Sequence, residues 1–214
     1  LELEGSEKPQ FQAKLFKIDG DKAEVANKAE ADEILKGLEG AKPVLEDIVK
    51  KERKRNPSAP FITSTLQQEA SRKLNFSPKK TMMLAQRLYE GIAMGRKGTV
   101  GLITYMRTDS VKLSDQALEE VRAFIPERYG KEFLPGSPNM YKSKKSAQEA
   151  HEAIRPTDVK LEPSTIKENL EKDMFRLYQL IWSRFVSCQM VPAVLDTTQF
   201  DIKNGKFLFR SNGS

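Results

Sequence analysis

Cysteine, histidine and tryptophan each occur only once in this chain of 214 residues. The single cysteine, Cys188, excludes disulfides within the chain and zinc sites built from several thiolates. The single histidine, His151, leaves no partner for a histidine or cysteine metal site. No apolar run approaches the roughly 18 residues that cross a membrane, and the start, Leu1-Glu2-Leu3-Glu4, lacks the features of a signal peptide. We therefore expect no membrane contact and a cytoplasmic location.

Charged residues are abundant: they make up 31% of the chain and give it a net charge of +6. This balance weakly favours a polyanionic partner such as nucleic acid. Hydrophobic residues make up 38% of the chain, enough for a normal globular core. The densest basic run, residues 50–57, has two interpretations: a solvated strand end or linker, or an edge that contacts phosphates.

Alternation of apolar and polar side chains predicts strands towards both ends of the chain. It occurs in three segments, 11–15, 43–49 and 194–202. Lys203-Asn204-Gly205-Lys206 is a strong hairpin signal after the last of them. A short helix is expected at 29–37, with Leu35 among its inward residues. The ends, at Leu1 and Phe209, look like strands cut short, so we expect an excerpt from a longer polypeptide.

The middle of the chain has the period of helices. Thr65 begins a pattern like a capping box, Ser77 precedes a proline as an N-cap does, and Ser114 caps a third helix. A further capping box at 146–149 opens a short segment that Pro156 must end. The longest helix is expected from about residue 172 to 190. One broad face of it is aromatic, and we interpret that face as core: Phe175, Tyr178, Trp182 and Phe185.

Together these patterns predict an α+β fold. A mainly helical domain, 65–191, is inserted into a β-rich domain made of residues 1–64 and return strands 192–214.

Tyr105 and Arg107 lie in an apolar, partly β-branched segment between two predicted helices. Residues 102–106 predict a short buried strand, on which Tyr105 and Arg107 share one face. A phenol ionises near pH 10 and becomes a useful nucleophile only when a cation or base stabilises the phenolate. A neighbouring guanidinium can do so and can also clamp phosphate oxygens. Taken alone, such a pair is more often a strand with one solvated face.

His151 and Arg155 form a second candidate pair. A spacing of four residues lets them share a helical face, and an imidazole that can gain a proton near neutral pH is a plausible phosphate partner. Alone, such a histidine is more often structural.

Three segments resemble signatures of the bacterial type IA DNA topoisomerases. They occur in the order found in that family, and the resemblance covers essentially the whole chain. The segments are PFITSTLQQEA at 60–70, GLITYMRTDS at 101–110 and AHEAIRPT at 150–157.

The resemblance implies a role for each candidate residue. Tyr105 matches the nucleophile that cuts one DNA strand and holds its 5′ phosphate. Arg107 matches the arginine that positions the scissile phosphate, and His151 a histidine close to the bound strand. Arg155 is assigned to a phosphate contact or a buried ion pair, and Asp109 to local architecture.

The resemblance also implies an ATP-independent enzyme that relaxes negatively supercoiled DNA, acts on single-stranded regions and works at the nucleoid. The helical part corresponds to the tyrosine domain of the family and the β-rich part to its arch. The family's TOPRIM domain, whose acidic residues bind Mg²⁺, is expected outside this chain. No cofactor is therefore expected within it, and the fragment alone should be inactive.

Three other interpretations compete with this one. A catalytically silent module that binds single-stranded DNA would share the basic surface. A tyrosine recombinase or type IB enzyme would need a cluster of arginines and histidines around a helical tyrosine. A purely structural domain leaves the three ordered signatures unexplained.

Overall fold

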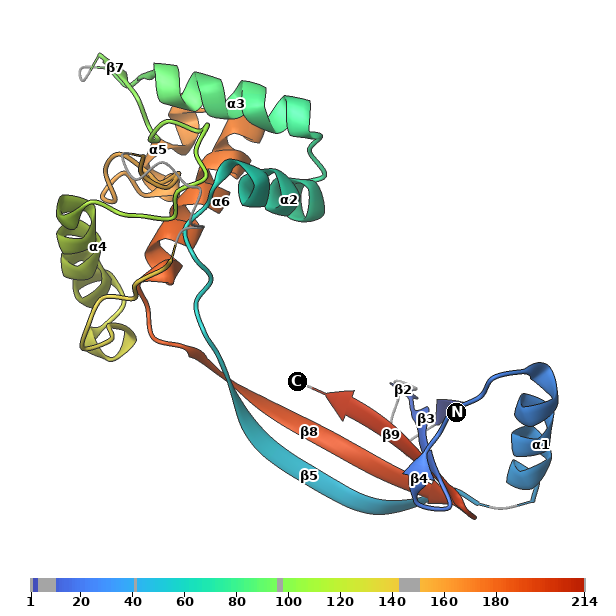
Figure 1. Cartoon of the computed structure of the whole chain (residues 1–214). Coiled ribbons are helices and arrows are strands. Elements are labelled where there is room, and N and C mark those ends of the chain that lie inside the picture. The colour runs from blue at the N-terminus through green and yellow to red at the C-terminus, as the bar shows by residue number, and fades with distance from the viewer. Residues whose placement is uncertain (1, 4–10, 41, 96–97, 143–150, 214) are drawn as a thin grey trace. The chain divides into compact units, whose positions relative to one another are not determined.

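The structure, a computed structural model, describes residues 2–3, 11–40, 42–95, 98–142 and 151–213 (Figure 1). The chain forms two compact units, Leu1–Arg55 with Ala193–Ser214, and Asn56–Pro192. The first is a sheet with one helix and the second is mainly helical, so the α+β class is confirmed. The units divide after residues 55 and 192, whereas the sequence places the joins near residues 64 and 191.

The sheet unit contains a five-stranded antiparallel sheet in the order β4-β3-β9-β8-β5. Its strands are β3 (Lys14–Ile18), β4 (Asp21–Lys22), β5 (Val44–Arg55), β8 (Ala193–Asn204) and β9 (Phe207–Gly213). The described residues also form the paired strands β1 (Glu2–Leu3) and β2 (Phe11–Gln12), and helix α1 (Lys28–Leu38).

Helix α1 covers one face of this sheet. The small core is built from Ala13, Ile202, Phe207 and Phe209, with Ile34 and Leu38 of the helix packed against it. At Gly37 an added Cβ would lie 2.9 Å from the Phe207 ring, so the close approach of helix and sheet requires glycine. The prediction that Leu35 faces inward is wrong: its side chain is 62% exposed.

The basic run 50–55 belongs to β5 and not to a linker. Strand β9 pairs with β8 only from Thr198 onward. Among the described strands, residues 51–55 and 193–197 therefore pair only with each other and form a two-stranded ribbon.

The helical unit is assembled around α6 (Lys172–Cys188), which packs against α2, α3 and α5 (Figure 1). The other elements are α2 (Thr63–Leu74), α3 (Pro78–Glu90), α4 (Asp115–Arg128), α5 (Pro163–Ile166), the hairpin strands β6 (Ile92–Ala93) and β7 (Thr99–Val100), and short 3-10 turns at Lys131–Phe133 and Lys167–Asn169.

Two of the predicted helix caps are confirmed. The Ser77 hydroxyl accepts the Lys80 N–H at 3.2 Å, and the Ser114 hydroxyl accepts the Ala117 N–H at 3.3 Å. Helix α2 begins at Thr63, earlier than predicted, because the Thr65 hydroxyl accepts the Ile62 N–H at 3.0 Å and closes its first turn. The capping box expected at 146–149 lies outside the described residues.

The aromatic face of α6 is core, as predicted, although Phe175 at one end of it is only partly buried. Tyr178 and Trp182 are buried and donate to backbone carbonyls of Leu161 and Val159 at 2.7 and 2.9 Å. Cys188 is also buried, and burial raises the pKa of its thiol to about 12. Among the described residues, no helix is both long enough and apolar enough to cross a bilayer.

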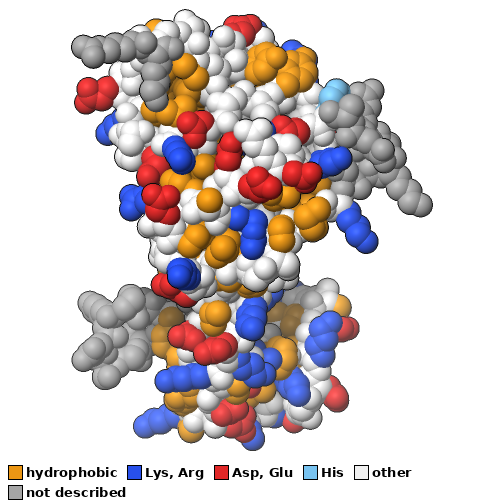
Figure 2. Space-filling view, turned by 90° about the vertical axis from the view of Figure 1, so that its left-hand side faces the viewer, with side chains coloured by type: hydrophobic (Ala, Val, Ile, Leu, Met, Phe, Trp, Pro, Cys, Tyr) orange, Lys and Arg blue, Asp and Glu red, His pale blue; other side chains and the backbone are white. Residues whose placement is uncertain are grey.

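The surface is strongly charged. Figure 2 shows one face of the molecule, on which Lys and Arg side chains are interspersed with Asp and Glu and with small groups of hydrophobic side chains. Surface charge as a whole therefore marks no binding site on that face.

Candidate functional site

The segment that carries Tyr105 is not the strand that the sequence predicts. Among the described residues its pairing is limited to one antiparallel bridge, between Ile103 and Pro156. The hydroxyl of Thr104 accepts the Arg155 N–H at 3.0 Å and donates to the Ala153 carbonyl at 2.7 Å. A continuing ladder would use both of these backbone groups, so the threonine side chain ends the pairing after one bridge.

Exposure nevertheless alternates along this segment as it would on a strand. Tyr105, Arg107 and Asp109 are exposed, whereas Met106 and Thr108 between them are buried. Tyr105 is 45% exposed. The Tyr105 and Arg107 side chains are therefore both exposed to solvent, although the segment is not a strand.

Hydrogen bonds hold the Tyr105 segment on both sides. On the C-terminal side, the Thr63 hydroxyl lies 2.8 Å from the Met106 carbonyl, and the Thr108 N–H donates to the same hydroxyl at 2.9 Å. On the N-terminal side, the Thr104 N–H donates to the Arg155 carbonyl at 2.9 Å. A third bond joins the two partner segments, from the Ile154 N–H to the Phe61 carbonyl at 2.8 Å. The three signature segments thus form one bonded unit.

Tyr105 lines a cleft of about 360 Å³. The other lining residues are Tyr89, Thr104, Thr108, His151 and Glu152. The Tyr89 and Tyr105 rings meet edge to face, with centroids 5.3 Å apart. Tyr89 itself is 41% exposed. The structure therefore brings the candidate nucleophile and the only histidine to one cleft.

Arg107 and Asp109 are exposed but do not line this cleft. Neither side chain makes a hydrogen bond or ion pair with another described residue. The local turn bonds come from their neighbours: the Ser110 N–H donates to the Thr108 hydroxyl, and the Lys112 N–H to the Ser110 hydroxyl, both at 3.1 Å.

His151 and Arg155 do not share a helical face. Residues 151–156 form no helix and carry isolated bridges at Ile154 and Pro156. His151 lines the cleft, whereas Arg155 is not among its lining residues.

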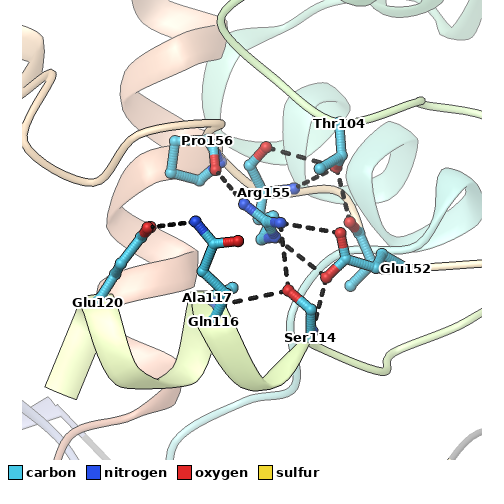
Figure 3. A network of polar contacts seen from close by, with 9 residues as sticks. Thr104, Ser114, Gln116, Ala117, Glu120, Glu152, Arg155 and Pro156 are labelled. Atoms are coloured by element: carbon cyan, nitrogen blue, oxygen red, sulfur yellow. Dashed lines mark hydrogen bonds and ion pairs between the residues drawn. The ribbon is translucent and has the colours of Figure 1, made fainter.

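Arg155 takes part in a largely buried ion pair (Figure 3). Its guanidinium lies 2.9 Å from the Glu152 carboxylate and donates to the Pro156 carbonyl at 3.0 Å. The Ser114 N–H donates to Glu152 at 2.6 Å, which ties the network to the start of α4. Of the two roles expected for Arg155, these contacts favour the ion pair over the phosphate contact.

Glu152 links the cleft to this network. Burial alone would raise the pKa of its carboxyl, but hydrogen bonds from Arg155 and Ser114 outweigh that effect and lower the pKa below its ordinary value. The carboxylate is therefore held ionised at neutral pH. An anion at the N-terminus of α4 also suits the helix dipole.

Glu152→Gln is expected to make unfolding less sensitive to acid. A lowered folded-state pKa stabilises the fold above the unfolded-state pKa of about 4.3, and this contribution is lost as the pH falls through the folded-state value. The variant should lose about 1–2 kcal/mol at pH 7 and approach the unmodified chain in acid. Thermal unfolding at a series of pH values measures this. Glu120→Gln, on the exposed face of α4, is the control, and a pH-independent loss at Glu152 would count against the argument.

Sequence reasoning missed the buried carboxylate of Glu69, which connects α2 to α6. It pairs with Lys73 at 3.0 Å and with Arg184 at 3.5 Å, and it also contacts Arg72. The hydrogen bond from Lys73 outweighs burial and lowers the pKa of Glu69. The spacing of Glu69 and Lys73 signals their pairing, but no local pattern points to a partner as distant as Arg184.

One Asp-x-Asp sequence, Asp19-Gly20-Asp21, occurs in the sheet unit. It forms the turn between β3 and β4, where Asp19 and Gly20 have φ values of 50° and 93°. Two left-handed residues suit a tight hairpin, which explains this sequence as turn chemistry. Within the described part of the chain, no three acidic, histidine or cysteine side chains form a metal-binding group.

Comparison with known proteins gives consistent matches. A family model described as DNA topoisomerase matches residues 3–214. The chain is 49% identical over 220 residues to DNA topoisomerase 1 of Rickettsia bellii, covering 100% of the chain and 27% of that protein. It is 50% identical over 212 residues to DNA topoisomerase 1 of Xylella fastidiosa strain 9a5c, covering 95% and 26%.

A solved structure is also similar. Full-length topoisomerase I from Thermotoga maritima superposes with a TM-score of 0.69 and 39% identity, over 90% of this chain and 30% of that one. The chain thus spans about a quarter to a third of the length of these relatives.

Proposed function

Because this chain belongs to the DNA topoisomerase family, we propose that it supplies the nucleophile of a type IA strand-cleavage site, and that the nucleophile is Tyr105. The observation that carries the proposal is the position of Tyr105. It is exposed, lines a cleft with His151, and lies on a segment that hydrogen bonds hold on both sides. A nucleophile has to be both accessible and positioned.

The reaction forms one O–P bond for each O–P bond that it breaks. The Tyr105 oxygen attacks a backbone phosphorus of single-stranded DNA, forming an O–P bond, while the bond from phosphorus to the 3′ oxygen of the preceding nucleotide breaks. The phenol proton ends on that 3′ oxygen. One phosphodiester replaces another, so the reverse attack by the 3′ hydroxyl reseals the strand without ATP. Strand passage between the two steps relaxes negative supercoils in the longer protein.

The neighbouring cations fit supporting roles. Arg107, exposed two residues from Tyr105, would move to the scissile phosphate and stabilise its developing charge. His151, which lines the same cleft, would contact the bound strand. Arg155 would act through Glu152, by holding the segment that carries His151. Asp109 remains a candidate for local architecture.

The remaining machinery belongs to the rest of the longer protein. A TOPRIM domain would bring acidic residues and Mg²⁺ to the phosphate, and the chain's own residues would supply the nucleophile and the cations. The described residues offer no metal-binding cluster of their own, so no step here is assigned to a metal. Action on chromosomal DNA would place the protein at the nucleoid, in the cytoplasm.

A reconstitution experiment tests the proposal. This chain is mixed with the separately produced TOPRIM portion of the parent protein, Mg²⁺ and end-labelled single-stranded DNA, and then denatured. We expect a labelled covalent adduct, and mass spectrometry of its peptides should place the nucleotide on Tyr105. A nucleotide on Tyr89 would refute the assignment, and tight binding without an adduct would support a silent DNA-binding module.

The chain alone is expected not to relax supercoiled plasmid. It provides a nucleophile and cations, and its described residues form no metal-binding group. Removing one electrostatic element of a site typically costs about a hundredfold to a thousandfold in rate. Gel electrophoresis of plasmid topoisomers measures this, with the parent protein as the positive control. Relaxation by the purified chain, free of host enzyme, would show that the site is complete within these residues.

A further inference from the structure

The second half of β5 carries the densest basic run in the chain, and the proposed cleavage cleft uses none of it. Residues 50–55 read Lys-Lys-Glu-Arg-Lys-Arg, and all six are exposed. The ion pairs that the structure describes in this unit involve other residues, such as Lys203 with Glu46 and Arg210 with Asp201. The five cations of the run therefore have no acidic partner among the described residues.

The pairing register sorts these residues onto two faces of the ribbon. Directly opposed residues of antiparallel strands share a face, and successive residues alternate between faces. One face, called the Lys51 face, contains the opposed pairs Lys51–Thr197, Arg53–Leu195 and Arg55–Ala193. The other, called the Lys50 face, contains Lys50–Thr198, Glu52–Asp196 and Lys54–Val194.

The two faces differ in charge although they lie on the same strands. On the Lys50 face, two cations are balanced by Glu52 and Asp196, which oppose each other directly. The Lys51 face has three cations and no acid between residues 51 and 55. Its cations recur every second residue, roughly 6.6 Å apart along the strand. The excess positive charge of the ribbon therefore lies on the Lys51 face.

We propose that the Lys51 face binds the phosphate backbone of single-stranded DNA, as a contact additional to the cleavage cleft. Long cationic side chains at regular intervals along an extended strand suit successive phosphates, which carry the dominant, sequence-independent part of DNA affinity. The acids of the Lys50 face would repel the same backbone. The inference rests on the proposed DNA substrate and is independent of the chemistry at Tyr105.

The ribbon is suited to holding such a row in place. Residues 51–55 are hydrogen-bonded along their length to residues 193–197. The Thr197 hydroxyl adds a bond to the Lys51 carbonyl, at 2.8 Å. Leu195, opposite Arg53, leaves apolar surface between the cations, on which sugars or bases can rest. The strand thus fixes the Cα positions while the side chains adjust to the phosphates.

A matched pair of variants tests the proposal. K51Q/R55Q and K50Q/K54Q each remove two positive charges, four residues apart, from opposite faces of β5. Affinity of the whole chain for a fluorescein-labelled oligothymidylate is measured by anisotropy over a range of salt concentrations. Each lost phosphate contact lowers the slope of log affinity against log salt by about 0.7. We expect a decrease of about 1.4 for K51Q/R55Q and an unchanged slope for K50Q/K54Q.

Equal decreases in the two variants would mean that only net charge matters, and would overturn the proposal. So would a slope that K51Q/R55Q leaves unchanged. Lysine footprinting needs no variant and gives a second measurement: bound DNA should protect Lys51 from acetylation more than it protects Lys50 or Lys54, and equal protection would count against the Lys51 face.

Failure of this inference can be told apart from failure of the proposed function. Removing the Tyr105 hydroxyl should eliminate the covalent adduct and leave the salt slope unchanged. K51Q/R55Q should lower the slope and leave the site of attachment at Tyr105. An adduct on Tyr105, together with equal salt slopes for K51Q/R55Q and K50Q/K54Q, would contradict this inference and leave the proposed function standing.

Discussion

Tyr105→Phe is expected to abolish the covalent link between the reconstituted protein and DNA. Phenylalanine lacks the oxygen that attacks phosphorus. The nearest other phenol, on Tyr89, belongs to a ring whose centroid is 5.3 Å away. We therefore expect no adduct above background, because losing the nucleophile removes the covalent route itself.

The same change should leave the fold intact. Tyr105 is 45% exposed, and phenylalanine retains the ring that meets Tyr89 edge to face. Stability should therefore change by less than about 0.5 kcal/mol. Binding of the uncleaved strand should also persist, since the cations are unchanged. Loss of the adduct with retained folding and binding would separate chemistry from recognition.

Tyr89→Phe is the matched control. It removes a phenol hydroxyl from the same cleft and keeps its ring. We expect the adduct to form in this variant, because Tyr89 is a neighbour of the nucleophile and not the nucleophile. The measurement is the fraction of end-labelled DNA that migrates with protein after denaturation. An adduct that survives in Tyr105→Phe and disappears in Tyr89→Phe would reverse the assignment.

Local signals in the sequence predicted the elements that local chemistry determines. Ser77 followed by Pro78, and Ser114, each mark a helix start because a side-chain oxygen satisfies a free N–H of the first turn. The turn at Asn204-Gly205 joins β8 to β9, with Gly205 at a φ of 60°. These features depend on residues that are neighbours in the chain, so the sequence is sufficient to find them.

Predictions failed where a distant partner decides the local structure. The Tyr105 segment has the composition of a strand, but the Thr104 hydroxyl takes the backbone groups of Arg155 and Ala153 and stops the ladder. Leu35 has the spacing of a core residue, but the helix residues that pack against the small core of the sheet unit are Ile34 and Leu38. Periodicity identifies an apolar face and cannot state how much of it the partner covers.

The candidate site was predictable in its residues and less so in its geometry. Tyr105 and His151 line one cleft, as a shared phosphate site requires, but they do so from two segments that are neither strand nor helix. The sequence allows two roles for Arg155, because the contacts that distinguish them include Ser114, a residue of another element. Spacing alone cannot supply that information.

Phe61→Ala is expected to cause the largest loss of stability among these changes. The Phe61 side chain is completely buried, and its ring packs beneath the Arg184 guanidinium at 4.4 Å from the centroid. Removing a buried phenylalanine ring typically costs about 3–5 kcal/mol, because burial is lost and a cavity remains. A loss of this size is a large fraction of the stability of an ordinary domain.

The single tryptophan makes this loss measurable in the helical unit alone. Trp182 is buried in α6, so its fluorescence during urea unfolding reports on that unit and not on the sheet. Phe133→Ala is the control, because Phe133 belongs to the same unit but is 43% exposed. We expect it to cost less than about 1 kcal/mol. Similar losses in the two variants would contradict the core position of Phe61.

The consequence for the site follows from the backbone around Phe61. Its carbonyl accepts the Ile154 N–H, and Thr63, two residues on, bonds to Met106 and Thr108. A loosened Phe61 therefore loosens both segments that form the cleft. Amide hydrogen exchange should accelerate at Ile154 and Thr108 in Phe61→Ala, and by more than at amides within α4. If exchange rose equally throughout the unit, Phe61 would support the fold without specifically holding the cleft.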